Sequence, residues 1–379
     1  MARKGENIRK RSDGRWEARI ITGYSETRKA IYKSVYGKTY TEVRTKRNVF
    51  IQENMINDTK RIRTSQSEFT FGQLMDQWLF SMKNKVKEST YAKYNHLIKA
   101  HIQPVLGGYL LKELDNQCLD QFIEQKLTNG KLNGSGGLSP KTVSDLLSLV
   151  SQVIRFGNER GYPCAQNLVI HYPKQIKPQI KILSDKQQKT LESYLFEHKD
   201  SISMGIILSL YTGLRIGEVC GLKWGDFCLD ENLLYVERTL MRIQNTDSNS
   251  KTKTKILIDK PKSDCSIRIV PISSFLIPYL QTLKKGNSCY FLTGTCNYME
   301  PRMYFKKYKV IMENCDLGEF NYHALRHTFA TRCVEKGFDM KSLSEILGHA
   351  DVTTTFRRYV HPSINMKKKQ IELLKCNSI

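Results

Sequence analysis

The chain has 379 residues, enough for two or three domains, and its 40% of hydrophobic residues can bury sizeable cores. Sixty Lys and Arg oppose 37 Asp and Glu, and the net charge of +23 predicts a polyanionic partner: DNA, RNA or an anionic membrane surface. No apolar run approaches the roughly 18–20 residues of a membrane span, and the polar N-terminus lacks a signal-peptide stretch. Both features argue against a membrane or secreted protein. The ten scattered cysteines, none in a C-x-x-C pair, indicate reduced thiols in a cytoplasmic protein and disfavour a zinc ribbon.

The N-terminal segment, residues 1–64, is the most densely charged, with 17 Lys and Arg against 7 Asp and Glu. A Ser-Asp-Gly turn at 12–14 separates a first strand from an alternating run over 16–21, and a second alternating run covers 31–36. Residues 39–57 open with the capping box Thr-Tyr-Thr-Glu, which predicts a helix. We expect a three-stranded sheet with one helix, which either enters a DNA groove or only adds basic charge and solubility.

The middle segment, residues 65–173, is nearly neutral, with 11 Lys and Arg against 9 Asp and Glu. Apolar stripes at helical spacing and capping signals predict four helices in it. They cover 71–82, a stretch from the cap Ser89 to Pro104 and Gly107, a stretch around 119–127, and a stretch from the cap Ser139 to Gly161. Such helices make a compact domain, and the aromatic stripe of the first helix is better explained as core than as a base-stacking platform.

The last segment carries 32 Lys and Arg against 21 Asp and Glu. Its pattern predicts a helix capped by Ser184, an apolar helix over 201–211, strands at 233–237, 256–259 and 266–271 with a polar tract at 245–255, and helices from Ser274 that dominate after Met303. The whole chain is therefore predicted to be a multidomain α+β protein. Its third part is a mainly helical domain with a small antiparallel sheet.

The predicted domains are 1–64, 68–165 and 174–379. The stretch 58–67 lacks apolar periodicity and is typical of a linker, and 162–180 contains three prolines and is predicted to be a second linker.

Six residues of the last segment carry groups that suit phosphoryl transfer: Arg215, Lys262, His323, Arg326, His349 and Tyr359. Arginines present planar charged forks that match phosphate oxygens, and they can stabilise charge that grows on those oxygens. A tyrosine hydroxyl can attack phosphorus and form a covalent ester, while a lysine can protonate the departing oxygen. Each residue alone is weak evidence, but the set suits metal-free phosphoryl transfer through a tyrosyl intermediate.

A metal site is not expected. His323 and His327 are spaced like two zinc ligands on a helix, but Ala324 stands where the H-E-x-x-H pattern requires glutamate. No cluster of carboxylates suggests a magnesium nuclease either. We therefore expect no cofactor.

Five stretches carry a family resemblance: Thr-Gly-Leu-Arg-Ile-Gly-Glu around Arg215, the predicted hairpin with Lys262, His-Ala-Leu-Arg-His-Thr-Phe-Ala-Thr from His323, Leu-Gly-His at His349, and Tyr359. In this order they resemble the tyrosine recombinases, the lambda-integrase class of site-specific DNA recombinases. The resemblance is close over the last predicted domain and looser over the helical one. With the basic N-terminal sheet, the chain resembles the integrases of conjugative transposons from Gram-positive bacteria.

The resemblance implies how a scissile phosphate would be held. Arg215 and Arg326 would bind its non-bridging oxygens, and His349 would help to hold it. Glu218, one turn after Arg215, would orient the site, and Trp224 would belong to the core.

The resemblance also implies the reacting groups. Tyr359 would become a 3′-phosphotyrosyl ester, His323 would assist proton transfer at the tyrosine, and Lys262 would protonate the leaving 5′ oxygen. Because the ester keeps the bond energy, strand exchange would need neither ATP nor metal.

The implied partner is double-stranded DNA, bound at core sites by the helical and catalytic domains and at distant arm sites by the N-terminal domain. A homotetramer on DNA and an excisionase or other DNA-bending accessory protein are also implied. A predicted helix over 363–374 could dock on a neighbouring protomer or pack on its own domain.

Three rival interpretations remain: a phage-type integrase or a chromosome-resolution recombinase of the same family, a topoisomerase-like enzyme of type IB, and a non-catalytic DNA-binding protein with a recombinase fold. The complete set of candidate residues argues against the last. The separate N-terminal module favours recombination over relaxation of DNA.

Overall fold

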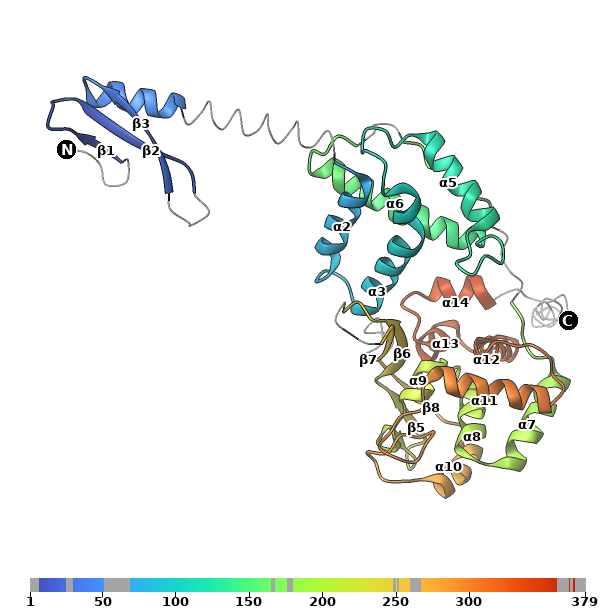
Figure 1. Cartoon of the computed structure of the whole chain (residues 1–379). Coiled ribbons are helices and arrows are strands. Elements are labelled where there is room, and N and C mark those ends of the chain that lie inside the picture. The colour runs from blue at the N-terminus through green and yellow to red at the C-terminus, as the bar shows by residue number, and fades with distance from the viewer. Residues whose placement is uncertain are drawn as a thin grey trace, which may run out of the picture. The chain divides into compact units, whose positions relative to one another are not determined.

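The structure is a computed structural model of the whole chain (Figure 1). The described residues are 7–24, 30–50, 69–164, 168–175, 180–247, 250, 252–259, 267–359, 368 and 371. The chain forms two compact units, which are described in turn.

An antiparallel sheet of three strands, in the order β1-β2-β3, opens the first unit. The strands are β1 (Ile8–Lys10), β2 (Trp16–Tyr24) and β3 (Ala30–Gly37). Ala18 pairs with Ile8 on one side and with Val35 on the other. Because side chains directly opposite each other share a face of the sheet, these three apolar side chains meet on one face. The predicted three-stranded sheet is confirmed.

A helix follows the sheet and is described over residues 40–50. The Thr39 hydroxyl accepts a hydrogen bond from the Glu42 amide at 3.2 Å, and the Glu42 carboxylate accepts one from the Lys38 amide at 2.8 Å. This is the predicted cap, with the carboxylate reaching one residue further back than in a capping box. Val43, fully buried, packs the helix against the sheet. The expected end of the helix lies outside the described residues.

Helices make up the rest of the first unit. They are α2 (Phe71–Met82), α3 (Glu88–Leu97), the π-helical turn η1 (Ile98–Ile102), α4 (Gln103–Leu106), α5 (Asn116–Asn129) and α6 (Pro140–Glu159). Residues 87–93, which include the first part of α3, are grouped with the second unit. The prediction that Ser89 caps the second helix is wrong, because the helix already begins at Glu88. Pro104 does not stop the helix either, since it lies in the first turn of α4, where its missing amide hydrogen is not needed.

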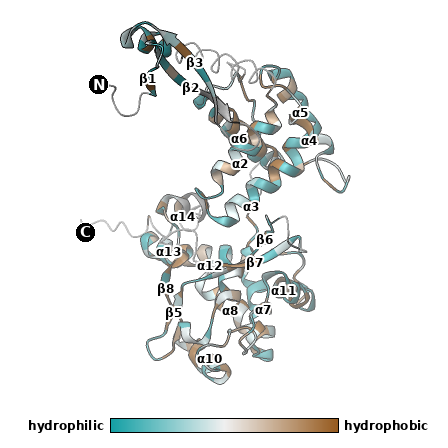
Figure 2. Ribbon diagram, turned by 60° about the vertical axis from the view of Figure 1, so that its left-hand side comes forward, coloured by the Kyte–Doolittle hydropathy of each residue, from teal (hydrophilic) through white to brown (hydrophobic). Residues whose placement is uncertain are grey.

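The apolar stripe of α2 is core, as its spacing predicts. Phe71, Leu74 and Trp78 are at most 2% exposed. The predicted cap Ser139 accepts a hydrogen bond from the Thr142 amide and starts α6. Figure 2 shows hydrophilic and hydrophobic stretches along the same helices, as expected when one face of each helix packs inward.

The second unit is mainly helical. Its helices are α7 (Asp185–His198), α8 (Ser201–Thr212), α9 (Ile216–Gly221), η2 (Trp224–Asp226), η4 (Ser274–Leu276), α10 (Ile277–Leu283), α11 (Pro301–Asn314), α12 (His323–Glu335), α13 (Met340–Leu347) and α14 (Val352–Tyr359). Ser184 caps α7 as predicted, with the reciprocal bonds of a capping box. The apolar helix α8 lies in the main core, where Trp224 is also buried.

Five short strands accompany these helices. They are β4 (Phe227–Cys228), β5 (Leu233–Val236), β6 (Thr239–Gln244), β7 (Thr254–Asp259) and β8 (Arg268–Pro271). They form an antiparallel sheet β4-β5-β8 and a hairpin β6-β7, not the single sheet expected from the sequence. The prediction also missed β4 and β6. The polar tract at 245–255 contributes its last two residues to β7.

The structure also bears on the expectations about membrane spans and cysteines. Among the described helices, none is both long enough and apolar enough to cross a membrane. The eight cysteines within the described residues are all free thiols.

Candidate active site

Four of the six predicted site residues have described side chains: Arg215, His323, Arg326 and His349. The backbone of α14 ends at Tyr359, whose side chain lies outside the description. Lys262 falls within 260–266, which also lies outside the described residues.

Arg326 is a cation held inside the protein, with only 1% of its surface exposed. Its Nη1 donates to the Gly213 carbonyl at 2.8 Å, and its Nη2 donates to the Leu347 carbonyl at 2.7 Å. The same Nη2 lies 2.8 Å from Nε2 of His349. These bonds compensate for the loss of water around the guanidinium, and they join the ends of α8 and α13 to α12.

Gly213 makes this connection possible. It ends α8 in the left-handed conformation, with φ of +69°, which glycine adopts without strain. A Cβ atom at this position would lie 2.7 Å from side-chain carbons of Leu347 and Phe329. The tight turn therefore brings the Gly213 carbonyl to Arg326, two residues before Arg215.

His349 follows Gly348, a second left-handed glycine that ends α13. A guanidinium has no acceptor atom, so Nε2 of His349 must accept the bond from Arg326. Nδ1 then carries the proton of the neutral ring, and it lies 2.7 Å from the hydroxyl oxygen of Thr355 on α14. The geometry thus fixes both the orientation and the tautomer of His349.

Arg215 is the N-cap residue of α9, and its side chain is about one third exposed. Its amide donates to Oε2 of Glu218 at 2.8 Å, and its Nη1 donates to Oε1 at 2.7 Å. Glu218 is 2% exposed. The carboxylate therefore holds the backbone and the side chain of Arg215 together.

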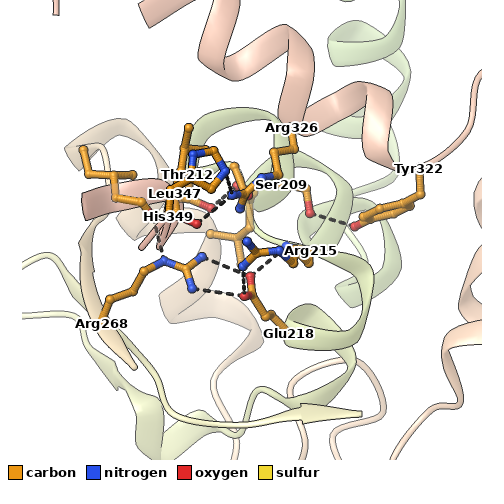
Figure 3. Close-up of polar contacts among 12 residues, drawn as sticks. Ser209, Thr212, Arg215, Glu218, Arg268, Tyr322, Arg326, Leu347 and His349 are labelled. Atoms are coloured by element: carbon orange, nitrogen blue, oxygen red, sulfur yellow. Dashed lines mark hydrogen bonds and ion pairs between the residues drawn. The ribbon is translucent and has the colours of Figure 1, made fainter. Parts of the chain in front are cut away.

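A residue that the sequence prediction missed completes this network. Arg268 on β8 donates from both terminal nitrogens to the two carboxylate oxygens of Glu218, each at 3.0 Å. Burial alone would raise the pKa of Glu218, but the charges and hydrogen bonds of Arg268 and Arg215 lower it to about 2. Nε of Arg268 donates to the Ile346 carbonyl at 2.6 Å. Figure 3 shows these contacts beside Arg326 and His349.

The sequence does contain a signal for Arg268. Along β8 the buried positions are Arg268 and Val270, while the isoleucine between them, Ile269, is 54% exposed. An arginine at the buried phase of a strand requires an ionised partner. This signal can be used only when it is known which alternate residues of the strand face the core.

His323 begins α12 one turn before Arg326, and its side chain is exposed. Its ring meets that of His327 edge-on, with centroids 4.6 Å apart. No group of three His, Cys, Asp or Glu side chains in the described part of the chain could hold a metal ion.

Together, these contacts gather three guanidinium groups and an imidazole around the ends of α8 and α13 (Figure 3). Arg215, Arg268 and Arg326 carry three positive charges and Glu218 carries one negative charge, so the cluster has a net charge of +2. Of these four side chains, Arg215 is the partly exposed one. Such a site suits a phosphate group, because permanently charged planar donors are already oriented before the anion arrives.

Comparisons with known proteins identify the family. Residues 173–366, more than half of the chain, match the Phage integrase family, and residues 70–127 match the phage integrase N-terminal SAM-like domain. A tyrosine recombinase XerC-like protein of Caldanaerobacter subterraneus subsp. tengcongensis is 28% identical, with 99% of each chain covered. The ICEBs1 integrase of Bacillus subtilis is 22% identical over 83% of this chain and 85% of its own.

Solved structures share the fold. The Tn1549 transposon integrase, in complex with a circular intermediate DNA, aligns with a TM-score of 0.63 at 20% identity, covering 81% of this chain and all of that one. A lambda integrase dimer bound to a core site aligns with a TM-score of 0.57 at 19% identity, covering 95% of this chain and 96% of that one. The chain therefore belongs to the phage integrase family, in the lambda-integrase class of tyrosine recombinases.

Proposed function

We propose that this tyrosine recombinase, an enzyme that cleaves and rejoins DNA at specific sites, excises and integrates a mobile element through a covalent 3′-phosphotyrosyl intermediate. The observation that carries the proposal is the convergence of Arg215, Arg326 and His349 in a chain of this family. The resemblance to the ICEBs1 and Tn1549 integrases supports a mobile element as the substrate.

Arg215 and Arg326 bind the non-bridging oxygens of the scissile phosphate in this proposal. The partly exposed guanidinium of Arg215 is available to DNA, while Arg326 would exchange its bond to His349 for one to the phosphate. His349, released from Arg326, takes up a proton at Nε2 and donates a hydrogen bond from it to a phosphate oxygen, while Nδ1 keeps its bond to Thr355. These donors stabilise the charge that develops on the oxygens as phosphorus becomes five-coordinate.

Tyr359 is the proposed nucleophile. Thr355, which contacts His349, lies four residues earlier on α14, so position 359 follows one helical turn later on the same side of the helix. The tyrosine oxygen forms a bond to phosphorus, the bond from phosphorus to the 5′ oxygen breaks, and Lys262 gives that oxygen a proton. His323 assists removal of the tyrosine proton. Attack by a 5′ hydroxyl from the second duplex reverses these steps and joins the strands.

A trapping experiment tests the nucleophile. The substrate is a nicked duplex with the attachment sequence of the encoding element. Cleavage near the nick releases a short fragment that carries the 5′ hydroxyl. Because this hydroxyl is then no longer present to rejoin the strand, the covalent complex accumulates. The wild-type chain should form a protein–DNA adduct that survives denaturation, and Tyr359→Phe should form none. Tyr298→Phe, at a half-exposed tyrosine of the same unit, serves as the control and should react normally. An adduct that persists in Tyr359→Phe would refute the assignment.

Lys262 can be tested through its leaving group. Lys262→Ala should cleave a normal duplex about 100-fold more slowly, because the 5′ oxygen then departs without a proton. A duplex with sulfur in place of that oxygen needs no protonation, and it should restore most of the rate. If the sulfur substrate is cleaved as slowly as the normal one, Lys262 is not the acid.

For the assembly, we propose a homotetramer on two DNA duplexes, with an excisionase or other DNA-bending protein setting the direction. Lambda integrase has been solved as a tetramer bound to a Holliday junction, which supports this assembly. Domains at 68–165 and 174–379 would bind the core site, and the domain at 1–64 would bind arm sites. Residues 363–379 lie almost entirely outside the described residues, and deleting them tests whether assembly on DNA depends on them.

A further inference from the structure

We propose that Arg268 is a positioning residue for DNA cleavage, which holds Arg215 and the turn before His349 in one arrangement. The inference rests on the proposed function, because it concerns the residues that would grip the phosphate. None of the matched family motifs quoted above includes Arg268, and its role follows from its contacts.

All three nitrogens of the Arg268 guanidinium are engaged. Nη1 and Nη2 form a two-pronged ion pair with Glu218, and Nε donates to the Ile346 carbonyl. The side chain is 5% exposed. Because the side chain is buried, Arg268 has no open path for binding DNA, and its effect on the phosphate must pass through its neighbours.

The first neighbour leads to Arg215. Oε1 of Glu218 accepts hydrogen bonds from both Nη1 of Arg215 at 2.7 Å and Nη1 of Arg268 at 3.0 Å. Without Arg268, the carboxylate would have Arg215 as its only charged partner among the described contacts, and it would hold that guanidinium more tightly. With Arg268 present, the three side chains keep one net positive charge, and Arg215 can offer it to a phosphate.

The second neighbour leads to Arg326 and His349. Arg268 donates to the carbonyl of Ile346, and Arg326 donates to the next carbonyl along the chain, that of Leu347. Two arginines from β8 and α12 thus hold consecutive carbonyls at the end of α13, immediately before the Gly348 turn that presents His349. Arg268 thus bonds to both sides of the site, to Glu218 beside Arg215 and to the carbonyl of Ile346 before His349 (Figure 3).

The test measures the rate of covalent adduct formation on the nicked attachment-site duplex at saturating full-length protein. Arg268→Met, which lacks the charge and the donors, should react about 100-fold more slowly, since a shift of about 1 Å in a holding group has such an effect. Arg268→Lys should recover part of the rate, because it restores the charge but not the fork. The dissociation constant for the duplex should stay within about threefold of the wild-type value.

Arg238→Met is the matched control. Arg238 pairs with the buried carboxylate of Asp226 at 2.6 Å in the same unit, and no described contact joins it to Arg215, Glu218, Arg326 or His349. Its loss should lower the melting temperature without slowing the reaction at a temperature where the variant is folded. If Arg268→Lys and Arg238→Met slow the reaction equally at equal folded fraction, Arg268 is only structural.

A double variant separates positioning from general stability. Because Arg268 acts partly through Arg215 and partly through the turn before His349, the double variant Arg215→Ala with Arg268→Lys should lose clearly less rate than the product of the two single losses. If the two losses of reaction rate simply multiply, the proposal is overturned. If Arg268→Met does not fold, Arg268→Lys alone decides, and a wild-type rate in that variant would also overturn the proposal. A wild-type chain that forms no Tyr359-dependent adduct would instead refute the proposed function, so the two failures are distinguishable.

Discussion

Arg326 shows why the residues of this site are hard to replace. Its buried guanidinium serves two carbonyls and the ring of His349 with donors in one plane. A lysine has the same charge but a single nitrogen, which cannot occupy the two positions from which the terminal nitrogens of Arg326 reach the three acceptors. Each acceptor left without a partner in the interior would cost about 1–3 kcal/mol.

Glu218 gives a prediction for pH dependence. Its pKa is lowered to about 2 in the folded chain, from an ordinary value of 4.5. A carboxyl with a lowered pKa stabilises the fold fully above pH 4.5, and this contribution disappears as the pH falls towards 2. The lowered pKa corresponds to a contribution of roughly 3 kcal/mol to the free energy of unfolding at neutral pH.

The measurement compares Glu218→Gln with the wild-type chain. At pH 7 the variant should unfold at a clearly lower temperature, and the difference should shrink between pH 4.5 and pH 2. Glu335→Gln, which loses an exposed ion pair with Arg332, should differ little from wild type at any pH. A difference for Glu218→Gln that stays constant below pH 4.5 would contradict the ion pair.

At the scale of elements, the joint between α8 and α9 depends on Gly213. Gly213→Ala would force a left-handed alanine and place its Cβ against Leu347 and Phe329. The strain and the overpacking together should cost about 2–4 kcal/mol. The displaced carbonyl would also weaken the hold on Arg326, so cleavage should slow at temperatures where the variant is folded.

Gly337→Ala is the control for this prediction. Gly337 also has a positive φ, +78°, but nothing lies within 4 Å of the added Cβ. Only the conformational strain remains in Gly337→Ala, so its free energy of unfolding should fall by about 1 kcal/mol. Thermal unfolding and adduct formation measure both effects. Equal losses in the two variants would show that the contact with Leu347 has no importance.

The outer face of the sheet β1-β2-β3 also has an organised set of charges. Glu17 is 2% exposed and accepts hydrogen bonds from Arg9, Arg19 and Ser34. The bonds from Ser34 and Arg9 contribute most to lowering its pKa to about 2. The carboxylate thereby holds two half-exposed arginines on one face, which suits the proposed contact with arm DNA.

For the whole molecule, the net charge of +23 predicts how DNA binding responds to salt. Residues 1–64 carry a net +10. A chain that starts at residue 65 should keep Tyr359-dependent cleavage of the core duplex and lose binding to arm-site duplexes. Removing one bond between a basic side chain and a phosphate lowers the slope of log affinity against log salt by about 0.9.

Binding titrations from roughly 50 to 200 mM salt on core-only and core-plus-arm duplexes measure this effect. The two chains should have equal slopes on the core duplex, and the full chain alone should gain slope when arm sites are added. If the shortened chain retains arm-site binding, the domain assignment is wrong.

The sequence alone determined most of the helices, because their signals are local. Ser139 and Ser184 cap their helices through contacts only three residues away, and the period of the apolar residues sets the buried face. It also determined the class of chemistry, since the order of the candidate residues is a property of the chain. Short strands such as β4 and β6 were missed, because two to six residues are stabilised by pairing with partners and not by their own sequence.

Only the tertiary structure decided how the site is held together. Arg326 meets a carbonyl 113 residues earlier, and Arg268 meets Glu218 across 50 residues and Ile346 across 78. No local pattern encodes such pairs, because the energy that buries a charge comes from the partner that packing brings to it. For that reason the sequence could name the groups that would hold the phosphate, but it could not reveal the arginine that positions them.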